Sequence, residues 1–518
     1  MPFTRIPVFP RKSAIVLVLA LAGCAVGPNY KRPEAAIPAA YKEAPEGWKV
    51  AQPADQVDRG NWWTIYNDPQ LNDLETRLNA SNQTVAQFAA VYRQARALVS
   101  EARASYFPTL GITGTGTRSG SSSRTGTSSG SVGNNFDLSL NASWEPDLWG
   151  SVSRTVGAQK AGEQSAAADL ANARLSAQGT LAQTYFQLRS LDAQQRLLDD
   201  TVAAYQRTLQ LTKNQYAQGT AARSDVIQAQ TQLLSAQASA IDNGVARAQF
   251  EHAIAALVGE PASTFSIASS PLDATPPEVA LEMPSAILER RPDVASAERK
   301  AAAANEQIGV TIAAFFPTLT FSASGGFQNS VLSQLLTAPS RFWTLGPSLA
   351  ANIFDGGLRI AQTEAARAAY DSAVATYRQT VLTAFQDVED NLASQRILAN
   401  EVVVQEQAVA SAQQALAIVT NQYKSGTVGF INVLTAQATA FTTEQKLASI
   451  AGQRMVSSVG LIKALGGGWD TAQIDQETGS AAAPVPASGV VLKGPSAALN
   501  PARGSSTVAA TSSGAAKE

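Results

Sequence analysis

The residues best suited to carry out chemistry in this sequence are one cysteine and one short run of carboxylates. Cys24 is the only cysteine among 518 residues, and His252 is the only histidine. A lone thiol forms no internal disulfide, and with one histidine it makes a poor metal site. Asp387, Glu389 and Asp390 could act as paired catalytic carboxylates, but no histidine or nucleophile lies near them. We therefore expect no enzyme and no metal site, and interpret these carboxylates as a solvated or lumen-facing charge cluster.

The segment before Cys24 suggests a different chemistry for the thiol. Basic residues precede an apolar run, residues 14–21, that is too short to span a bilayer, which is the layout of an export signal. The motif LAGC resembles the signal of bacterial lipoproteins, which implies cleavage after residues 1–23 and a covalent lipid on Cys24. Ala25 in place of aspartate then implies the outer membrane. The alternative is a chance cysteine beside a signal that is cleaved elsewhere.

Composition excludes several other classes of protein. The chain has 39 basic and 41 acidic residues, a net charge of −2 and no basic run, so nucleic acid is not expected as a partner. After the export signal, no segment reaches the roughly 18 consecutive apolar residues of a transmembrane helix. The length permits two or more domains.

The sequence contains an internal repeat. The motif YFPTL at Tyr106 returns as FFPTL at Phe315, and NQYxxGT at Asn214 returns at Asn421. Nearly equal spacing of the two pairs predicts two copies of one unit. The expected organisation is an N-terminal extended segment at 24–70, a first repeat at 71–258, a Pro-rich linker at 259–284, a second repeat at 285–468 and a low-complexity tail at 469–518.

Alternation of apolar and polar residues follows the proline of each motif and predicts two strands in each unit. It is clearest over residues 136–144, and the second unit repeats it in phase. Trp144, Phe342 and Trp343 lie near strand ends, as the aromatic girdles of membrane strands do. Pro347 is interpreted as a bulge. The alternative is a soluble hairpin with one buried face.

Helical patterns rich in Ala and Gln connect these strands to distant turns. A helix from Gly150 to Tyr216 would be roughly 100 Å long. Gly219 would end it as a C-cap glycine, and Gly426 would end its counterpart in the second unit. The strands therefore mark one end of the molecule and the Gly-Thr turns mark the other. The remaining helical patterns cover 71–105, 223–258, 285–314 and 431–465.

Four strands per chain cannot close a barrel, and lipid does not tolerate an open sheet edge. Two chains would supply about eight strands, which their own side chains would fill, whereas three would supply about twelve and leave a lumen. We therefore expect an α+β membrane protein that forms a trimeric β-barrel continued by a long α-helical barrel. A pore-less, lipid-anchored coiled-coil tether is a weaker alternative, because a tether needs no polar strand face.

Five motifs carry a resemblance to a known family: CAVGPNY from Cys24, WW at Trp62, DPQL from Asp68, ERRPDV from Glu289 and IFDGG from Ile353. In this order they resemble the motifs of the outer-membrane factor family of TolC and OprM, most of all its acylated NodT-type branch. The resemblance extends from Cys24 to about Gly468 and implies a homotrimeric duct that docks a periplasmic adaptor and an RND-type inner-membrane transporter. It implies passive conduction of exported small molecules, with protein export by a type I secretion system as the alternative.

The resemblance also implies a periplasmic gate at the Gly-Thr turns. Acidic residues ring the constriction in that family, but the matching Asn432 and Thr435 are uncharged here, so no cation-binding ring is expected. Ser224, Asp225 and Tyr423 match residues of the closing tethers, while valine replaces the arginine of that network. The alternative role of Asp225 is to cap its own turn.

Two further motifs have competing interpretations. Trp62 and Trp63 could stack on a ligand, but packing of the N-terminal segment is favoured. The run Arg290-Arg291-Pro292-Asp293 could bind an anion. The favoured interpretation is that Pro292 occupies the first helical position and that Asp293 interacts with the positive end of the helix.

Overall fold

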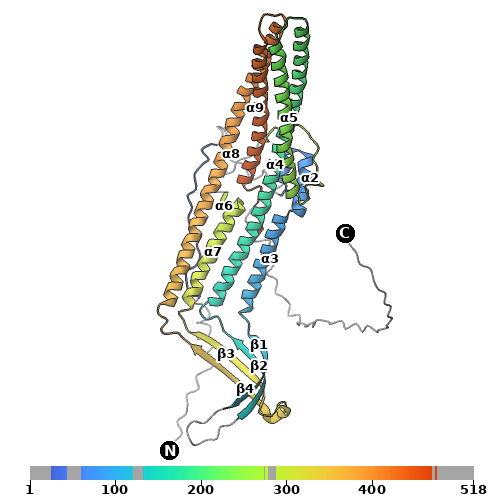
Figure 1. The fold of residues 1–518 in the computed structure, drawn as a ribbon. Coiled ribbons are helices and arrows are strands. Elements are labelled where there is room, and N and C mark those ends of the chain that lie inside the picture. Colours follow the sequence, from blue (N-terminus) through green and yellow to red (C-terminus); the bar gives the residue numbers. More distant parts are fainter. Residues whose placement is uncertain are drawn as a thin grey trace, which may run out of the picture.

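A computed structural model of the chain describes residues 25–43, 60–120, 132–272, 275–277, 287–469 and 473–474. The described part is elongated, with a sheet at one end and helices that run away from it (Figure 1). The predicted signal peptide, Cys24 and most of the predicted tail lie outside the described residues and stay predictions. None of the described helices is both long and apolar enough to cross a membrane.

The sheet has four antiparallel strands in the order in which they occur in the chain. The predicted bulge at Pro347 is wrong, because Pro347 pairs with Phe321 in an unbroken register. Its strand is at the edge of the sheet, where a missing N–H group is tolerated. The strands are β1 (Thr109–Gly120), β2 (Val132–Trp144), β3 (Thr318–Asn329) and β4 (Arg341–Ala350).

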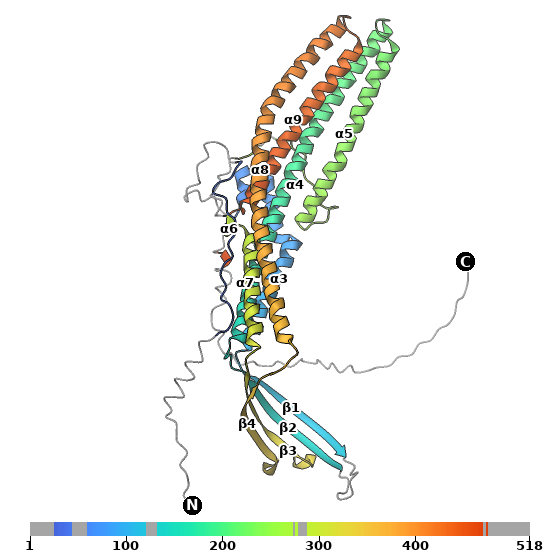
Figure 2. The same cartoon turned by 90° about the vertical axis from the view of Figure 1, so that its left-hand side faces the viewer.

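Two helices of 67 residues each, α4 and α8, run the length of the helical part (Figure 2). Each ends near a glycine with positive φ, Gly219 at 75° and Gly426 at 76°, as the sequence predicts. The next residue, Thr220 or Thr427, donates its N–H to a carbonyl of the last helical turn. The helices concerned are α4 (Ser151–Ala217), α5 (Arg223–Leu257), α8 (Leu358–Lys424) and α9 (Phe430–Ala464).

The predicted single helix over 71–105 is wrong. The chain forms α2 (Pro69–Ser81) and α3 (Gln83–Ala104), with a break at Asn82. The Asn82 carboxamide oxygen accepts from the Val85 N–H at 3.0 Å, and its Nδ2 donates to the carbonyl of Leu257 at 2.7 Å. The end of α5 is thereby joined to the start of α3.

The second unit has an equivalent joint. The predicted helix over 285–314 consists, in its described part, of α6 (Ile287–Arg290) and α7 (Pro292–Ala313). The Arg291 side chain donates to the carbonyl of Ala464, the last residue of α9, at 3.2 Å. Helices α3 and α7 therefore continue α5 and α9, respectively, toward the sheet, alongside α4 and α8.

The largest hydrophobic core lies at the level of these joints. Trp62 and Trp63 are buried in η1 (Trp62–Tyr66), with an edge-to-face ring contact at 5.9 Å. Their neighbours in the core include Tyr185 of α4 and Met455 of α9. The Trp62 indole also donates to Gln178 at 3.2 Å. The favoured packing role of the tryptophan pair is therefore confirmed.

Residues 25–43 form an extended strap along the helices between the sheet and this core. The Tyr30 hydroxyl donates to the Glu298 carboxylate of α7 at 2.6 Å. At the other end of the strap, the backbone N–H groups of Lys42 and Glu43 donate to the two oxygens of Glu389, at 2.8 and 3.0 Å. The strap is thus tied to α7 and α8.

The core also contains an unpaired carboxyl group, which predicts a pH dependence of stability. Glu75 of α2 is fully buried, and both of its oxygens lack a hydrogen-bond partner among the described residues. Burial raises the pKa of Glu75 from 4.5 to about 9. The unfolded chain therefore binds fewer protons than the folded chain between these values, and stability falls as the pH rises through that window.

We expect Glu75→Gln to raise the unfolding temperature of the detergent-solubilised protein at pH 8, with an advantage that shrinks toward pH 5. The contribution of Glu75 to the unfolding free energy changes by at most about 1.4 kcal/mol per pH unit. Glu101→Gln, an exposed site on α3, is the control and should have little effect. A stability difference that stays constant between pH 5 and pH 8 would contradict a buried, titrating Glu75.

Candidate functional site

One face of the sheet is apolar, and it is exposed in the single chain. Residues paired across neighbouring strands point to the same face, so the register aligns the apolar residues of all four strands. The exposed fraction is 75% for Ile112 and 80% for Trp343. Such a surface is typical of membrane or protein contact. The face carries Leu110, Ile112, Leu138, Leu140, Ala142, Trp144, Leu319, Phe321, Ala323, Trp343, Leu345 and Leu349.

The opposite face is polar, which confirms the phase predicted from the sequence. Its hydroxyl and amide groups bond to one another: Ser139 donates to Asp137 at 2.8 Å and Asn141 donates to Thr113 at 3.2 Å. One assignment is wrong. The sequence grouped Phe342 with Trp343 as girdle residues, but neighbouring residues of a strand point to opposite faces. Phe342 therefore belongs to the polar face.

Aromatic residues mark the end of the sheet next to the helices. Trp144 stacks on Phe321 with ring centroids 6.0 Å apart, and Trp149 stacks on Phe316 at 4.8 Å. The Trp149 indole donates to the carbonyl of Pro317 at 2.7 Å. These contacts join the two halves of the chain where strands give way to helices.

At the far tip, an apolar cluster joins the two helical hairpins. Tyr423 packs on Phe430 with ring centroids 5.4 Å apart, and Leu209 of α4 lies in the same cluster. Burial raises the pKa of Tyr423, the negative charge of Asp225 adds to the shift, and the nearby Thr212 hydroxyl opposes it. The Tyr423 hydroxyl makes no hydrogen bond in the described part of the chain.

Of the other candidate gate residues, Ser224, Asn432 and Thr435 are exposed and Asp225 is half-buried. Ser224 donates to Asp225 at 3.3 Å within the same turn, and no hydrogen bond joins Asp225 to Tyr423 among the described residues. On α9, the Asn432 side chain donates to the carbonyl of Gly429 at 3.4 Å, and Thr435 donates to the preceding turn at 3.0 Å. Their role in a gate stays a prediction. The described residues contain no group of ligands that could hold a metal ion.

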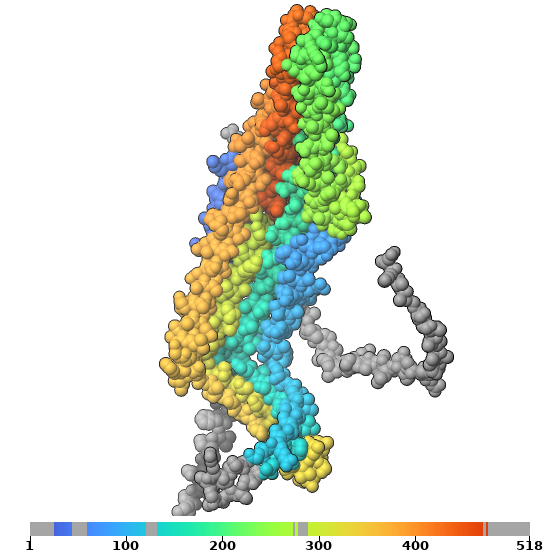
Figure 3. All heavy atoms as spheres, viewed as in Figure 1, coloured from blue at the N-terminus to red at the C-terminus, as the bar shows by residue number. Residues whose placement is uncertain are grey.

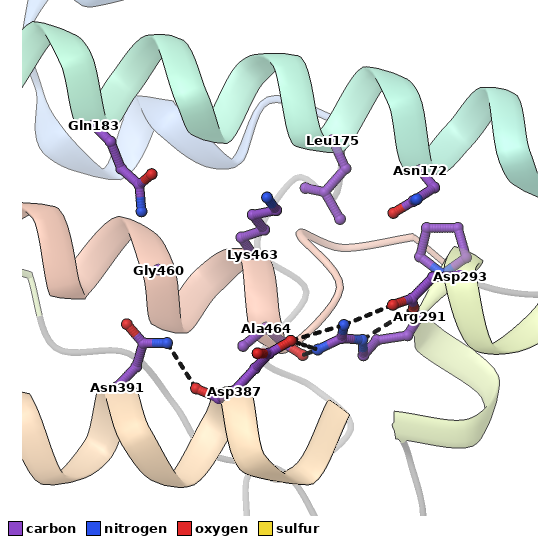
Figure 4. Close-up of a pocket in the computed structure, with 11 residues that line it drawn as sticks. Asn172, Leu175, Gln183, Arg291, Asp293, Asp387, Asn391, Gly460, Lys463 and Ala464 are labelled. Atoms are coloured by element: carbon purple, nitrogen blue, oxygen red, sulfur yellow. Dashed lines mark hydrogen bonds and ion pairs between the residues drawn. The ribbon is translucent and has the colours of Figure 1, made fainter. Parts of the chain in front are cut away.

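The three candidate carboxylates on α8 bind different partners and form no catalytic set. Glu389 holds the N-terminal strap, and Asp390 accepts a hydrogen bond from Gln386 at 3.3 Å. Asp387 is paired with Arg291 at 3.1 Å in a polar pocket between α4, α7, α8 and α9 (Figure 4). The prediction of a solvated or lumen-facing cluster is therefore incomplete, because two of the three carboxylates connect separate parts of the chain.

Arg291 is the residue whose role the sequence did not reveal. Its guanidinium binds Asp293 at 2.7 Å, Asp387 at 3.1 Å and the carbonyl of Ala464 at 3.2 Å. Pro292 is the first residue of α7 and Asp293 lies in its first turn, as predicted. The break at Asn82 did have a signal, because asparagine before a helical run is a typical N-cap.

This fold places the chain among the outer-membrane channels. The solved structure of the outer-membrane channel OprN matches with a TM-score of 0.80 and 27% identity, over 86% of this chain and 100% of that one. Residues 75–260 and 283–467 match the outer membrane efflux protein family. The chain belongs to that family, whose members are channels rather than enzymes, and its location is the outer membrane.

Two relatives illustrate the range of the family. The chain is 31% identical to the pyoverdine export outer membrane protein OpmQ of Pseudomonas aeruginosa, over 83% of this chain and 92% of that protein. It is 30% identical to the solvent efflux pump outer membrane protein SrpC of Pseudomonas putida, over 91% of this chain and 100% of that protein. The names of these two relatives describe different transported compounds.

The Arg291 joint predicts a loss of stability on substitution. Arg291→Gln removes charge-assisted bonds to Asp293 and Asp387, each worth about 1.5–3 kcal/mol when fully formed. We expect the unfolding free energy in detergent to fall by about 2 kcal/mol, since Asp387 is partly exposed. Arg367→Gln is the control, because its 3.9 Å contact with Glu364 is largely solvent-exposed. Equal losses in both variants would argue against a structural role for Arg291.

Proposed function

We propose that this protein is the exit duct of a tripartite efflux pump. In this proposal, three copies form one β-barrel in the outer membrane and one α-helical barrel in the periplasm. A periplasmic adaptor and an RND-type inner-membrane transporter deliver small molecules, which pass through the duct without chemical change. The observation that carries the proposal is the four-stranded sheet, which has an exposed apolar face, a polar face and two open edges.

The open edges favour a trimer. Among the described residues, β1 and β4 each leave one row of backbone groups unpaired, and such groups cost several kcal/mol each in lipid. Pairing β4 of one copy with β1 of the next satisfies both rows and closes a ring. Three copies would contribute about twelve strands, which leaves a lumen lined by the polar faces.

The helical part supports the same ring. Helices α8, α9, α4 and α5 pack in that order, so α8 and α5 are at opposite edges (Figure 3). Both edge helices expose large apolar residues at multiples of seven residues, a spacing typical of helix-to-helix packing. Each edge would pack against the opposite edge of the next copy. The residues are Ile227, Leu234 and Ile241 on α5, and Ile397, Val404 and Ile418 on α8.

The N-terminal strap supports a lipid anchor on Cys24. Ala25 packs against Gly150, where a side chain on the glycine would collide with it. The Val26 N–H donates to the carbonyl of Trp149 at 3.1 Å. The residue that follows the predicted acylated cysteine is thus bound at the junction of sheet and helices. A lipid attached there would enter the membrane leaflet that faces the periplasm.

The cargo class follows from the relatives. OpmQ is named for pyoverdine export and SrpC for solvent efflux, and both names describe small molecules rather than proteins. This favours small-molecule efflux over type I protein secretion. The polar strand face disfavours the pore-less tether, because a tether without a lumen does not require a second, hydrated face.

We further propose that the resting duct is closed at the helical tip, with Ser224, Asp225 and Tyr423 among the residues that hold it. Since Asp225 makes no hydrogen bond to Tyr423 within one chain, such a tether requires rearrangement of the tip or a contact with a neighbouring copy. The uncharged Asn432 and Thr435 would line the constriction in place of carboxylates.

Adjacent strand residues test the barrel. Leu345→Lys would place a charge on the lipid-facing side at about the midplane and should cost about 2–4 kcal/mol. Thr344→Lys, the preceding residue on the polar face, should be mild. We expect the yield of heat-stable trimers from outer membranes to fall sharply only for Leu345→Lys. Similar yields for the two variants would contradict the assignment of lipid and lumen faces.

The uncharged tip predicts weak block by divalent cations. The double variant Asn432→Asp with Thr435→Asp would build a ring of about six carboxylates in a trimer. Its single-channel current in planar bilayers should become sensitive to low concentrations of Mg²⁺. The unmodified channel should be much less sensitive, and Thr439→Asp, one turn farther along the exposed face of α9, gives a control for added charge. Strong Mg²⁺ block of the unmodified channel would contradict an uncharged constriction.

A further inference from the structure

The polar face of the sheet contains one large apolar side chain and one charged side chain. Over the four strands as described, every other residue on this face is threonine, serine, asparagine, glutamine, glycine or alanine. The apolar exception is Phe342 of β4, and the charged exception is Asp137 of β2. The two arginines of these strands, Arg118 and Arg341, belong to the opposite face by the same register.

Phe342 and Asp137 lie on adjacent rows of the sheet. Phe342 pairs with Gly326, which pairs with Ser139. Asp137 is two residues from Ser139 on the same strand and the same face, and it accepts the Ser139 hydroxyl at 2.8 Å. Gly326, which lies between Phe342 and Ser139 in that row, has no side chain, and Phe342 is half-buried in the single chain.

We propose that Phe342 and Asp137 form a binding subsite for aromatic cations inside the barrel. This inference rests on the proposed trimeric duct, in which the polar face lines the lumen and threefold symmetry repeats the pair three times. The face of a phenylalanine ring attracts cations and stacks on other rings. A carboxylate on a face whose other described strand residues are uncharged attracts cations of any kind. Together the two groups select solutes that are both cationic and aromatic.

Block of single-channel current in planar bilayers tests the subsite. Tetraphenylphosphonium is the aromatic probe, and tetraethylammonium is the cation without rings. Phe342→Leu keeps an apolar side chain and removes the ring, so block by tetraphenylphosphonium should weaken about three- to tenfold while tetraethylammonium block is unchanged. Asp137→Asn should weaken block by both cations. Phe342→Trp should restore or strengthen block by the aromatic cation.

Trp343→Leu is the matched control, because Trp343 is the next residue and points to the opposite face. It should leave block by both cations unchanged. One outcome is that the Phe342→Leu variant loses heat stability as a trimer and is still blocked by tetraphenylphosphonium as strongly as the unmodified channel. In that case the ring only packs over Gly326, and the subsite is refuted. Failure of the unmodified protein to form heat-stable trimers in outer membranes would instead refute the proposed duct. Block that depends on Trp343 rather than Phe342 would also overturn the assignment.

Discussion

The need to pair every backbone N–H and C=O group in lipid governs this molecule. The four-stranded sheet has an exposed apolar face, and its two edges are unpaired among the described residues. In the proposed barrel the edge strands are the surfaces of assembly, and the rest of the described chain is consistent with that requirement. The order of strands follows the order in the sequence, so each copy presents β1 at one edge and β4 at the other. The edge helices α5 and α8 present apolar rows at the same two sides.

The length of the helical part depends on two joints. No returning helix reaches the sheet, because α5 ends at Leu257 and α9 ends at Ala464. Asn82 and Arg291 each bind a terminal carbonyl of the helix above and lie at the start of the helix below. Carbonyls that would otherwise be unsatisfied at a buried helix end are thereby paired. The core around Trp62 and Trp63 lies at this level and covers the joints.

Local periodicity made much of the fold predictable. Strand phase, the positions of the long helices and the glycines that end them follow from patterns within a few residues, and the structure agrees with them. Long-range pairing was not predictable: Arg291 and Asp387 are far apart in the sequence, and nothing near either residue identifies the other. The face of Phe342 was predictable, because period two places it opposite Trp343 whatever its aromatic character. The candidate gate residues make no hydrogen bond to the Tyr423 hydroxyl among the described residues, so a gate contact could not be derived from one chain.

The extended strap has a mechanical consequence. Residues 25–43 are tied to α7 by Tyr30 and to α8 by the backbone bonds to Glu389, and the strap reaches the level of the Arg291 joint but does not pass far beyond it. Beyond the joints, residues 267–270 tie the next turns of α5 to α4, because Arg247 donates to the carbonyl of Ile267 and the Ser270 N–H donates to Asp192. Among the described residues, the last turns of the two helical hairpins have neither support. In the proposed duct, a force applied at the tip would therefore bend those last turns first and leave the section next to the sheet nearly undeformed.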